Sequence, residues 1–218
     1  MVIKPYFIVG KSSVEHSTLS SWENELELQN INLIKLNIID TYLNLTLKTI
    51  AMMKWVSMFC NSTKFIAKVD DDTLVDITNL KLVISAAQRC NLTNTFMGRY
   101  IGEHRISPPG KANMRWHINN QAYPSDTWPS YTQGLMYIFT SDICDTVLRR
   151  VLDRFTPIVN IEDVFLTGIV RVLEVIHLTP FPMRFKSKCI DTEGKCQRII
   201  ARTDYDFINK KFKRQTVP

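Results

Sequence analysis

The sequence has no run of about 18 consecutive apolar residues, so no transmembrane helix is expected within its 218 residues. Its first residues do not have the pattern of a signal peptide. It contains no internal repeat and no low-complexity linker. Its apolar content of 45% and charged content of 22% are typical of a chain that buries a core. These features predict one folded domain that covers residues 1–218.

The cysteine pattern also lacks a zinc template, because the five cysteines form no pair of C-x-x-C motifs. Three Asn-X-Ser/Thr sequons accompany the cysteines, and together they indicate a secretory compartment that permits disulfides. The sequons are at Asn44, Asn61 and Asn91. We predict two disulfides, Cys60–Cys90 and Cys189–Cys196, and a free thiol at Cys144.

The basic residues do not form the patch that a nucleic-acid-binding protein needs. The formal net charge is +6 and the isoelectric point is near 9.1, values that would suit an anionic partner. However, lysines and arginines are scattered, apart from a cluster in residues 210–214, and no stripe of interleaved basic and aromatic residues is present. The sequence therefore argues against nucleic acid as a partner.

Apolar residues alternate between strand-like and helix-like spacing along the chain. Strands are expected at residues 6–10, 31–36, 64–69, 95–100 and 135–140. Helices are expected at residues 17–30, 41–59, 77–89, 141–152 and 162–175, with an amphipathic piece near 205–212. Residues 101–129 have the pattern of a long irregular insertion, and the tail from residue 181 is expected to be loop-rich. This alternation predicts an α/β domain with a central, mostly parallel sheet flanked by helices.

Three consecutive carboxylates, Asp70, Asp71 and Asp72, follow the apolar strand expected at residues 64–69. Ligands of open α/β sheets bind at the carboxyl ends of the strands, where this triplet is expected to lie. Carboxylate oxygens suit a hard divalent cation such as Mn²⁺ or Mg²⁺, which in turn binds a diphosphate. The alternative is a solvated acidic turn, and the triplet alone leaves both interpretations open.

A second acidic pair, Glu162 and Asp163, precedes an apolar helical segment. A carboxylate at this place can simply cap the helix. It can also serve as the base that accepts a proton when a sugar hydroxyl attacks an anomeric carbon. Neighbouring residues on a helix point in different directions, so only one of the two is expected to have that role.

Four blocks extend these local motifs: DTYLNLTLKT at residues 40–49, KVDDDTLV at 68–75, WPSYTQGLMY at 128–137 and EDVFLTG at 162–168. In this order and spacing they resemble the blocks of the β-1,3-glycosyltransferases, glycosyltransferase family 31. That family includes β-1,3-galactosyltransferases and β-1,3-N-acetylglucosaminyltransferases, with Fringe as a relative. The resemblance covers about residues 6–210.

The resemblance implies a GT-A fold, a UDP-sugar donor, Mn²⁺ as cofactor, and inversion at the anomeric carbon to give a β1-3 linkage. It also implies that Asp163 is the general base and that Asp72 is the main metal ligand, assisted by Asp70. The residues expected to contact or support the nucleotide are Asp40, Tyr42, Lys48, Lys68, Asp70 and Asp71. For Tyr42 and Trp55, packing in the core is the favoured alternative.

The same resemblance implies a biological setting. The donor is expected to be UDP-galactose or UDP-N-acetylglucosamine, and the acceptor a glycan of a glycoprotein or glycolipid. The full-length protein is expected to be a single-pass type II membrane protein of the Golgi apparatus. This chain would be its lumenal catalytic domain, and the anchor, the stem and the first strand of the family would be missing from it.

The chain departs from the family pattern in two places. Gly134 is the one glycine of a stretch that is usually glycine-rich, and bulk at Gln133, Leu135 and Met136 is expected to narrow the acceptor site or alter the backbone path. Thr132 stands where a cysteine is usual, and Ala201 begins the segment where relatives place a histidine. These departures leave an alternative function open, that of a catalytically inactive relative that acts as a glycan-binding or chaperone-like partner.

Overall fold

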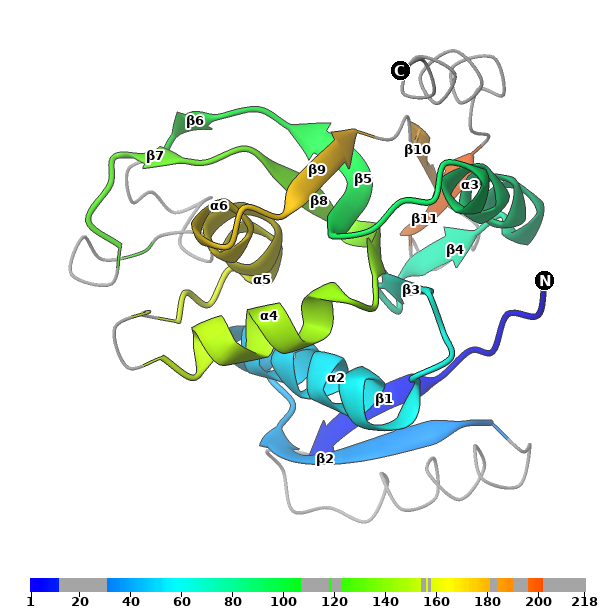
Figure 1. Ribbon diagram of the computed structural model, residues 1–218, viewed down its shortest axis with the longest axis horizontal. Helices are drawn as coiled ribbons and strands as arrows, with labels where there is room; N and C mark the ends of the chain where they lie inside the picture. Colours follow the sequence, from blue (N-terminus) through cyan, green and yellow to red (C-terminus); the bar gives the residue numbers. More distant parts are fainter. Residues whose placement is uncertain are drawn as a thin grey trace.

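The computed structural model describes residues 1–11, 31–106, 118, 123–153, 156 and 158–180, and the backbone of residues 184–189 and 196–201. The helix expected at residues 17–30, the amphipathic piece near 205–212 and the basic cluster of residues 210–214 lie outside these residues. Figure 1 shows a four-stranded sheet at the centre of the molecule, with helices on both of its faces.

The central sheet has the strand order β3-β8-β5-β9. Its strands are β3 (Phe65–Val69), β8 (Tyr131–Thr140), β5 (Thr95–Ile101) and β9 (His177–Pro180). β8 runs antiparallel to both β3 and β5, whereas β5 and β9 are parallel. The prediction of a mostly parallel sheet is therefore wrong here. β8 reaches the sheet after the long segment that follows β5, and a return of this kind allows antiparallel pairing without a crossover helix.

The structure describes three smaller sheets besides the central one. β1 (Phe7–Lys11) pairs in parallel with β2 (Leu33–Ile39), near the strands expected at 6–10 and 31–36. Two short strands, β6 (His104–Arg105) and β7 (Thr127–Trp128), pair within the expected insertion. β4 (Thr73–Val75) pairs with β11 (Cys196–Ala201), which forms a hairpin with β10 (Arg184–Cys189). The expectation of a loop-rich tail from residue 181 is wrong for this hairpin, because its strands pair with each other and with β4.

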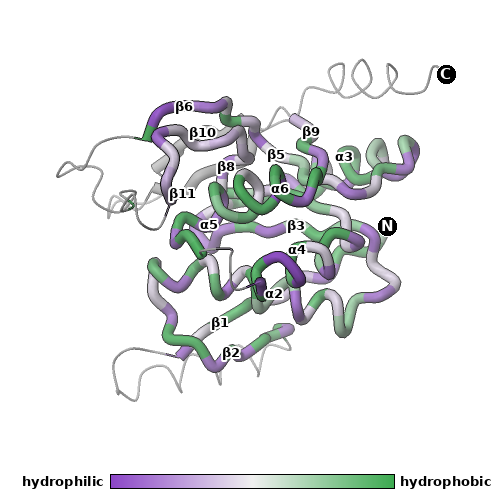
Figure 2. Tube along the Cα trace, turned by 60° about the vertical axis from the view of Figure 1, so that its left-hand side comes forward, coloured by the Kyte–Doolittle hydropathy of each residue, from purple (hydrophilic) through white to green (hydrophobic). Residues whose placement is uncertain are grey.

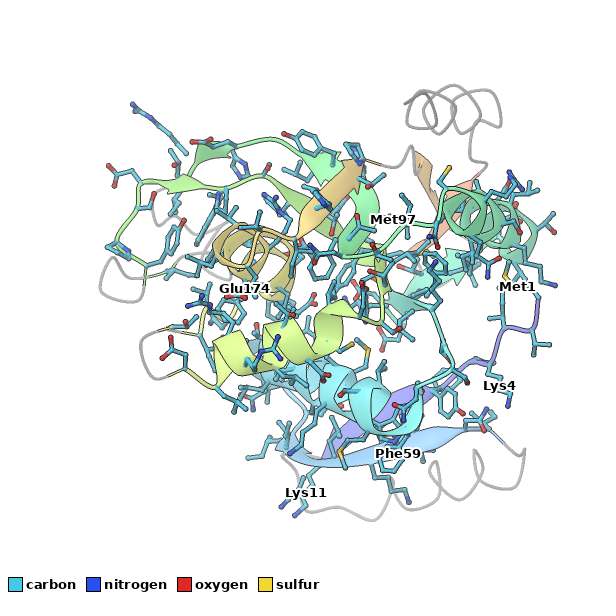
Figure 3. The ribbon with its side chains drawn as sticks, viewed as in Figure 1. Met1, Lys4, Lys11, Phe59, Met97 and Glu174 are labelled. Carbon is cyan, nitrogen blue, oxygen red and sulfur yellow. The ribbon has the colours of Figure 1, made fainter. Side chains whose placement is uncertain are left out.

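Helices cover the two faces of the central sheet, and each face has its own core cluster (Figure 1). α2 (Leu45–Phe59), which follows a 3-10 turn at Tyr42–Asn44, and α4 (Ile143–Val151) pack with Phe96, Tyr137 and Phe139. α3 (Ile77–Arg89) packs on the other side with Met97, Met136 and Ile138. Successive residues of β5 and β8 thus point to opposite clusters, as the two-residue period of a strand requires. Met97, which belongs to the cluster under α3, is labelled in Figure 3. Figure 2 shows that α3 itself carries both hydrophobic and hydrophilic residues.

The helical segment at residues 162–173 changes its winding along its length. It begins as α5 (Glu162–Val164), continues as a π-helix at Phe165–Val170 and ends as α6 (Arg171–Leu173). The apolar pattern predicted a helix over these residues but not the π-helical stretch. Such stretches are uncommon and often occur at functional sites.

The cysteines on the two faces of the sheet do not pair. Cys60, Cys90 and Cys144 are all thiols, so the predicted Cys60–Cys90 disulfide is wrong and the predicted thiol at Cys144 is confirmed. Cys60 packs against the cluster of α2 and α4, whereas Cys90 packs against the cluster of α3, which places the sheet between them. The backbone of Cys189 lies directly opposite that of Cys196 in the β10–β11 pair, and their disulfide stays a prediction.

Candidate active site

The acidic triplet lies at the carboxyl end of β3, where the chain turns into β4. The turn is held by two backbone hydrogen bonds: Asp70 N donates to Leu135 O at 3.0 Å, and Thr73 N donates to Asp70 O at 3.1 Å. Asp71 and Asp72 are exposed, whereas Asp70 is partly buried. Asp72 Oδ1 accepts a hydrogen bond of 3.3 Å from the Thr73 hydroxyl. The triplet therefore presents two carboxylates to solvent and turns one toward the protein.

Lys68 is the residue that Asp70 faces. Its side chain is buried, with the residue only 7% exposed, and its ammonium donates to Asp70 Oδ1 and, at 2.8 Å, to Gly134 O. A third acceptor, Glu162 Oε2, lies 3.4 Å from the same nitrogen. Burial alone would lower the pKa of Lys68, but Glu162 and Asp70 outweigh it and raise that pKa. These contacts direct the ammonium into the protein. The expected contact of Lys68 with a nucleotide stays a prediction.

Glu162 completes a buried polar network beneath the triplet. The residue is 4% exposed, and its Oε1 accepts a hydrogen bond from the Tyr137 hydroxyl. Burial raises the pKa of Glu162, and the charge of Lys68 opposes that shift. Burial, followed by the charge of Glu162, raises the pKa of Tyr137 well above its ordinary value. The Lys68 ammonium also lies 5.7 Å from the centre of the Tyr137 ring.

Asp163 occupies a different environment from its neighbour Glu162. Its Oδ2 accepts a hydrogen bond of 2.8 Å from Gly134 N, and its Oδ1 accepts one of 2.9 Å from Val164 N. Burial, followed by the charge of Glu162, raises the pKa of Asp163 to about 6, although the two N–H donors act in the opposite direction. The side chain remains partly exposed. It is therefore a carboxylate of a partly exposed residue, with a pKa near the operating range of a general base.

Gly134 is required by the close approach of β8 to Asp163. A Cβ at residue 134 would lie 2.9 Å from Asp163 Oδ2 and 3.2 Å from Asp163 Cβ, closer than side chains pack. The next residues of the altered glycine stretch, Leu135 and Met136, are both buried, and Met136 belongs to the core cluster under α3. The expectation that Met136 narrows the acceptor site is therefore wrong, because its bulk lies in the core.

Two threonines fasten the Asp163 segment to β8. Thr132 N donates to Thr167 Oγ1 at 2.9 Å, and Thr167 Oγ1 donates to Asp163 O at 2.7 Å. The Thr132 side chain is fully buried, and within the described residues its hydroxyl has no hydrogen-bond partner. Gly168 packs so tightly here that an added Cβ would lie 3.3 Å from Pro129 Cγ. The blocks at 128–137 and 162–168 thus form one packed unit.

A second polar group lies at the carboxyl ends of β1 and β2. Asp40 Oδ2 accepts hydrogen bonds from Gly10 N at 2.9 Å and from Lys48 Nζ at 2.7 Å. Burial would raise the pKa of Asp40, but its bonds with Lys48 and Gly10 outweigh burial and lower it. Tyr42 is 43% exposed, so the alternative of core packing is wrong for Tyr42, whereas Trp55 does pack against the core cluster of α2.

The amino-terminal turn of α2 connects this group to the Glu162–Asp163 segment. Lys48 binds Asp40 on one side of the helix. Thr46, two residues earlier, is buried and donates from its hydroxyl to Val159 O at 2.9 Å. Val159 lies just before α5, and α2 also contacts α5 directly. The start of α2 therefore fixes both polar groups relative to one another.

The comparisons with known proteins identify the family. The sequence model of the galactosyltransferase family matches residues 1–180, which is most of the chain. The chain belongs to the galactosyltransferase family. The expected relationship to the β-1,3-glycosyltransferases is thereby confirmed.

Curated relatives match this galactosyltransferase-family chain over part of their length. Mouse (Mus musculus) β-1,3-galactosyltransferase 5 is 32% identical over 164 residues, which are 75% of this chain and 50% of the relative. Lactosylceramide 1,3-N-acetyl-β-D-glucosaminyltransferase B of Danio rerio is 30% identical over 145 residues, 66% of this chain and 37% of the relative. Human (Homo sapiens) β-1,3-galactosyltransferase 5 is 29% identical over 215 residues, 94% of this chain and 66% of the relative. The chain thus spans about half the length of the mouse relative.

The acidic triplet of this galactosyltransferase-family chain fits a metal only with help from a ligand. Among the described residues, no three His, Cys, Asp or Glu side chains lie close enough together to hold a metal ion. Asp72 is exposed and free to turn to a cation, whereas Asp70 is held by Lys68. One or two carboxylates completed by phosphate oxygens and water are a usual arrangement for hard divalent cations. The donor set therefore fits a metal bound together with a diphosphate.

Sequence reasoning missed three contributors to the site. The N–H of Gly134, the hydroxyl of Tyr137 and the buried carboxylate of Glu162 were not predicted to act together. Tyr137 and Gly134 occur within the block at 128–137, and Glu162 begins the block at 162–168. The blocks themselves were thus a signal, but only the tertiary contacts show which atoms meet.

Proposed function

We propose that this chain is the catalytic domain of an inverting glycosyltransferase with a GT-A fold. It transfers galactose or N-acetylglucosamine from a UDP-sugar to a glycan hydroxyl and forms a β1-3 linkage. The observation that carries this proposal is the state of Asp163, a partly exposed carboxylate that two backbone N–H groups hold in place and whose pKa is about 6.

Asp163 is the base that accepts the proton of the acceptor hydroxyl. Sugar hydroxyls are weak nucleophiles at neutral pH, and a positioned base accelerates their attack by about 10²–10⁴-fold. With a pKa of about 6, the carboxylate is mostly ionised at pH 7 and still basic enough to take the proton. In a single displacement, the acceptor hydroxyl attacks the anomeric carbon from the face opposite the leaving group, which inverts the configuration of that carbon. The Gly134 and Val164 N–H groups keep Asp163 in place during this step.

The donor nucleotide is proposed to bind along the carboxyl ends of β1, β2 and β3. Asp72, with Asp70, would hold Mn²⁺ there, which when bound neutralises the charge of the departing diphosphate. The residues proposed to contact or support the nucleotide are Asp40, Tyr42, Lys48, Asp70 and Asp71, and Lys68 is proposed to support the nucleotide site from its buried position. Asp40 and Lys48 are already joined by an ion pair with two hydrogen bonds, which favours a role for both in holding the nucleotide site in shape.

The acceptor and the cellular setting belong to the same proposal. The acceptor is a glycan of a glycoprotein or glycolipid, and the name of the Danio rerio relative refers to a glycolipid, lactosylceramide. The full-length protein is proposed to be a type II protein of the Golgi membrane with this domain in the lumen. No helix in the part of the chain that the structure describes is both long and apolar enough to span a bilayer.

A transfer assay tests the proposal. The protein is incubated with Mn²⁺, a glycan acceptor, and either UDP-galactose or UDP-N-acetylglucosamine, and the product linkage is determined by NMR. We expect a β1-3 product with one donor and a loss of at least about a hundredfold in Asp163→Asn. Asp145→Asn, on the surface of α4, is the matched control. UDP binding without transfer of either sugar would overturn the transferase proposal.

The design must allow for the two hydrogen bonds of Asp163. Each of its oxygens accepts a backbone N–H, so asparagine can keep only one of these bonds. We expect a cost of about 1 kcal/mol in unfolding free energy from the lost bond. Thermal unfolding of Asp163→Asn therefore accompanies the assay. A variant that remains folded, binds UDP and fails to transfer isolates the role of the base.

A further inference from the structure

The ammonium of Lys68 lies between the two acidic sites and contacts both of them. On the side of the triplet it donates to Asp70 Oδ1, and on the other side it lies 3.4 Å from Glu162 Oε2. Each of these acids adjoins the group that acts: Asp70 belongs to the triplet that ends in Asp72, and Glu162 precedes Asp163. One cation thus joins the donor side of the site to the base side.

We propose that Lys68 is a positioning residue that sets the distance between the carboxylates on the donor side and the catalytic base. This inference rests on the proposed transferase function. An in-line displacement needs its base and its leaving-group site at a fixed separation, and a displacement of about 1 Å can cost about 10²-fold in rate. A shared buried cation supplies such a fixed point.

The hydrogen-bonding capacity of Lys68 supports this role. An ammonium has three N–H donors, and three protein acceptors surround this one: Asp70, Glu162 and Gly134 O, the last at 2.8 Å. The third acceptor belongs to the glycine whose N–H binds Asp163. Lys68 therefore holds the backbone that positions the base as well as the two acids. Its burial separates it from solvent and from a ligand at the triplet.

Tyr137 restrains both Glu162 and Lys68. Its hydroxyl donates to Glu162, and its buried ring lies 5.7 Å from the Lys68 ammonium. Glu162 is thereby held by a hydroxyl and a cation, so it has little freedom to follow a displaced Lys68. A buried polar network that is satisfied in this way favours one arrangement of its members.

A purely structural ion pair would share these contacts, so the test must separate folding from positioning. Lys68→Met leaves Glu162 buried without its cation and is expected to destabilise the fold. The double variant Lys68→Met/Glu162→Gln removes both charges and keeps an acceptor for the Tyr137 hydroxyl. Replacing a buried ion pair by well-packed apolar residues of similar volume is often neutral for stability, whereas removal of one partner alone is strongly destabilising. The double variant should thus regain stability while Asp70 and Gly134 lose their link.

Lys64→Met is the matched control, because Lys64 precedes the same strand and its ammonium binds Asn91 at 2.7 Å, at the other end of β3. The wild type, both Lys68 variants and the control are compared in thermal unfolding, in UDP–Mn²⁺ calorimetry, and in kcat and KM. In the double variant we expect thermal stability near that of the wild type, UDP affinity within about threefold, and kcat lower by about a hundredfold. The control should match the wild type in all three measurements.

The other outcomes overturn the inference in distinguishable ways. Wild-type kcat in a folded double variant would mean that Lys68 serves stability alone. Lost UDP affinity with an unchanged kcat would make Lys68 a direct nucleotide ligand instead. A double variant that does not regain stability would make the charged network an element of the fold. A wild-type protein that transfers no sugar would instead overturn the proposed function, and the positioning role with it.

Discussion

Gly134 N donates a hydrogen bond of 2.8 Å to Asp163 Oδ2, and the absence of a side chain at residue 134 is what permits this approach. A Cβ there would lie 2.9 Å from the same oxygen. The backbone of β8 therefore fixes the position of the Asp163 carboxylate. In a family member whose glycine stretch is otherwise altered, this one glycine has a direct steric reason to be present.

Gly134→Ala should displace Asp163 and reduce transfer. The new methyl group must push the carboxylate away, and a shift of that kind is expected to lower kcat by about 10- to 100-fold. UDP binding should change little, because the triplet lies at the end of β3. Gly102→Ala is the matched control, since among the described residues a Cβ at residue 102 would meet only Tyr100 Cε1, at 3.7 Å. Equal losses in both variants would mean that the contact with Asp163 is not what limits the rate.

Asp72→Asn should weaken UDP binding to the same extent as removal of Mn²⁺ by a chelator. Asp72 is exposed, and within the described residues its side chain accepts a hydrogen bond from the neighbouring Thr73 hydroxyl. The change should therefore leave the fold intact. We expect UDP affinity measured by calorimetry to fall at least about tenfold, because a charged ligand of a hard cation is lost. Asp145→Asn serves again as the surface control. Unchanged UDP affinity in Asp72→Asn would assign the metal to another carboxylate.

Local patterns predicted the elements that carry the site but not their contacts. β3, α2 and α3 were predictable because their apolar residues recur at the spacing of a strand or a helix. The triplet could be placed at the end of β3 for the same reason. In contrast, the burial of Lys68 depends on Glu162, which is distant in sequence and adjoins it only in the folded chain. A charged residue on a strand gives no local signal of such a partner.

The errors have the same origin. The antiparallel direction of β8 depends on how the chain returns after the segment that follows β5, which apolar spacing does not reveal. The Cys60–Cys90 disulfide was predicted because these cysteines flank β3 and α3 in the sequence, whereas the two cysteines lie on opposite faces of the sheet. Core packing was the favoured alternative to a nucleotide-site role for Tyr42, yet Tyr42 lies on the surface, two residues after Asp40.

Thr132→Val should increase stability. The Thr132 hydroxyl is buried without a hydrogen-bond partner in the described part of the chain, and such a group costs about 1–3 kcal/mol. Valine has nearly the same shape and leaves the backbone bond from Thr132 N to Thr167 intact. We expect a gain of about 1 kcal/mol, or about 2–4 °C in Tm for a chain of this size. Thr132→Ser keeps the hydroxyl and should not be stabilised, and a lower Tm for Thr132→Val would contradict this account.

Cys189 and Cys196 should form a disulfide in oxidised protein. They are directly opposite each other in the antiparallel β10–β11 pair, where Cα atoms are about 4.5–5.5 Å apart. That separation is within the range that a disulfide can bridge. Peptide mapping without reduction should find this pair joined and Cys60, Cys90 and Cys144 available to an alkylating reagent after unfolding. A linked Cys60–Cys90 peptide would be inconsistent with the positions of these residues on opposite faces of the sheet.

The rate of transfer should rise with pH through the pKa of Asp163, which is about 6. The base must be ionised to accept a proton, so kcat/KM is expected to increase about tenfold from pH 5 to pH 7 and then to level off. The residual activity of Asp163→Asn should lack this rise. A wild-type profile that is flat between pH 5 and pH 7 would remove Asp163 from the role of base.

The same ionisation should lower the unfolding free energy of the protein as the pH rises, whereas it raises the rate of transfer. Because the pKa of Asp163 is raised from 3.8 in the reference state to about 6 in the fold, the protonated form is favoured by folding. That contribution is complete below about pH 3.8 and is lost as the pH rises through about 6. The asparagine side chain of the Asp163→Asn variant does not titrate, so the unfolding free energy of the wild type should fall relative to the variant between pH 4 and about pH 7. Denaturant titrations of both proteins across this range measure the difference. A constant difference would show that Asp163 has an ordinary pKa, and the predicted rise in transfer would then lie near pH 4 instead.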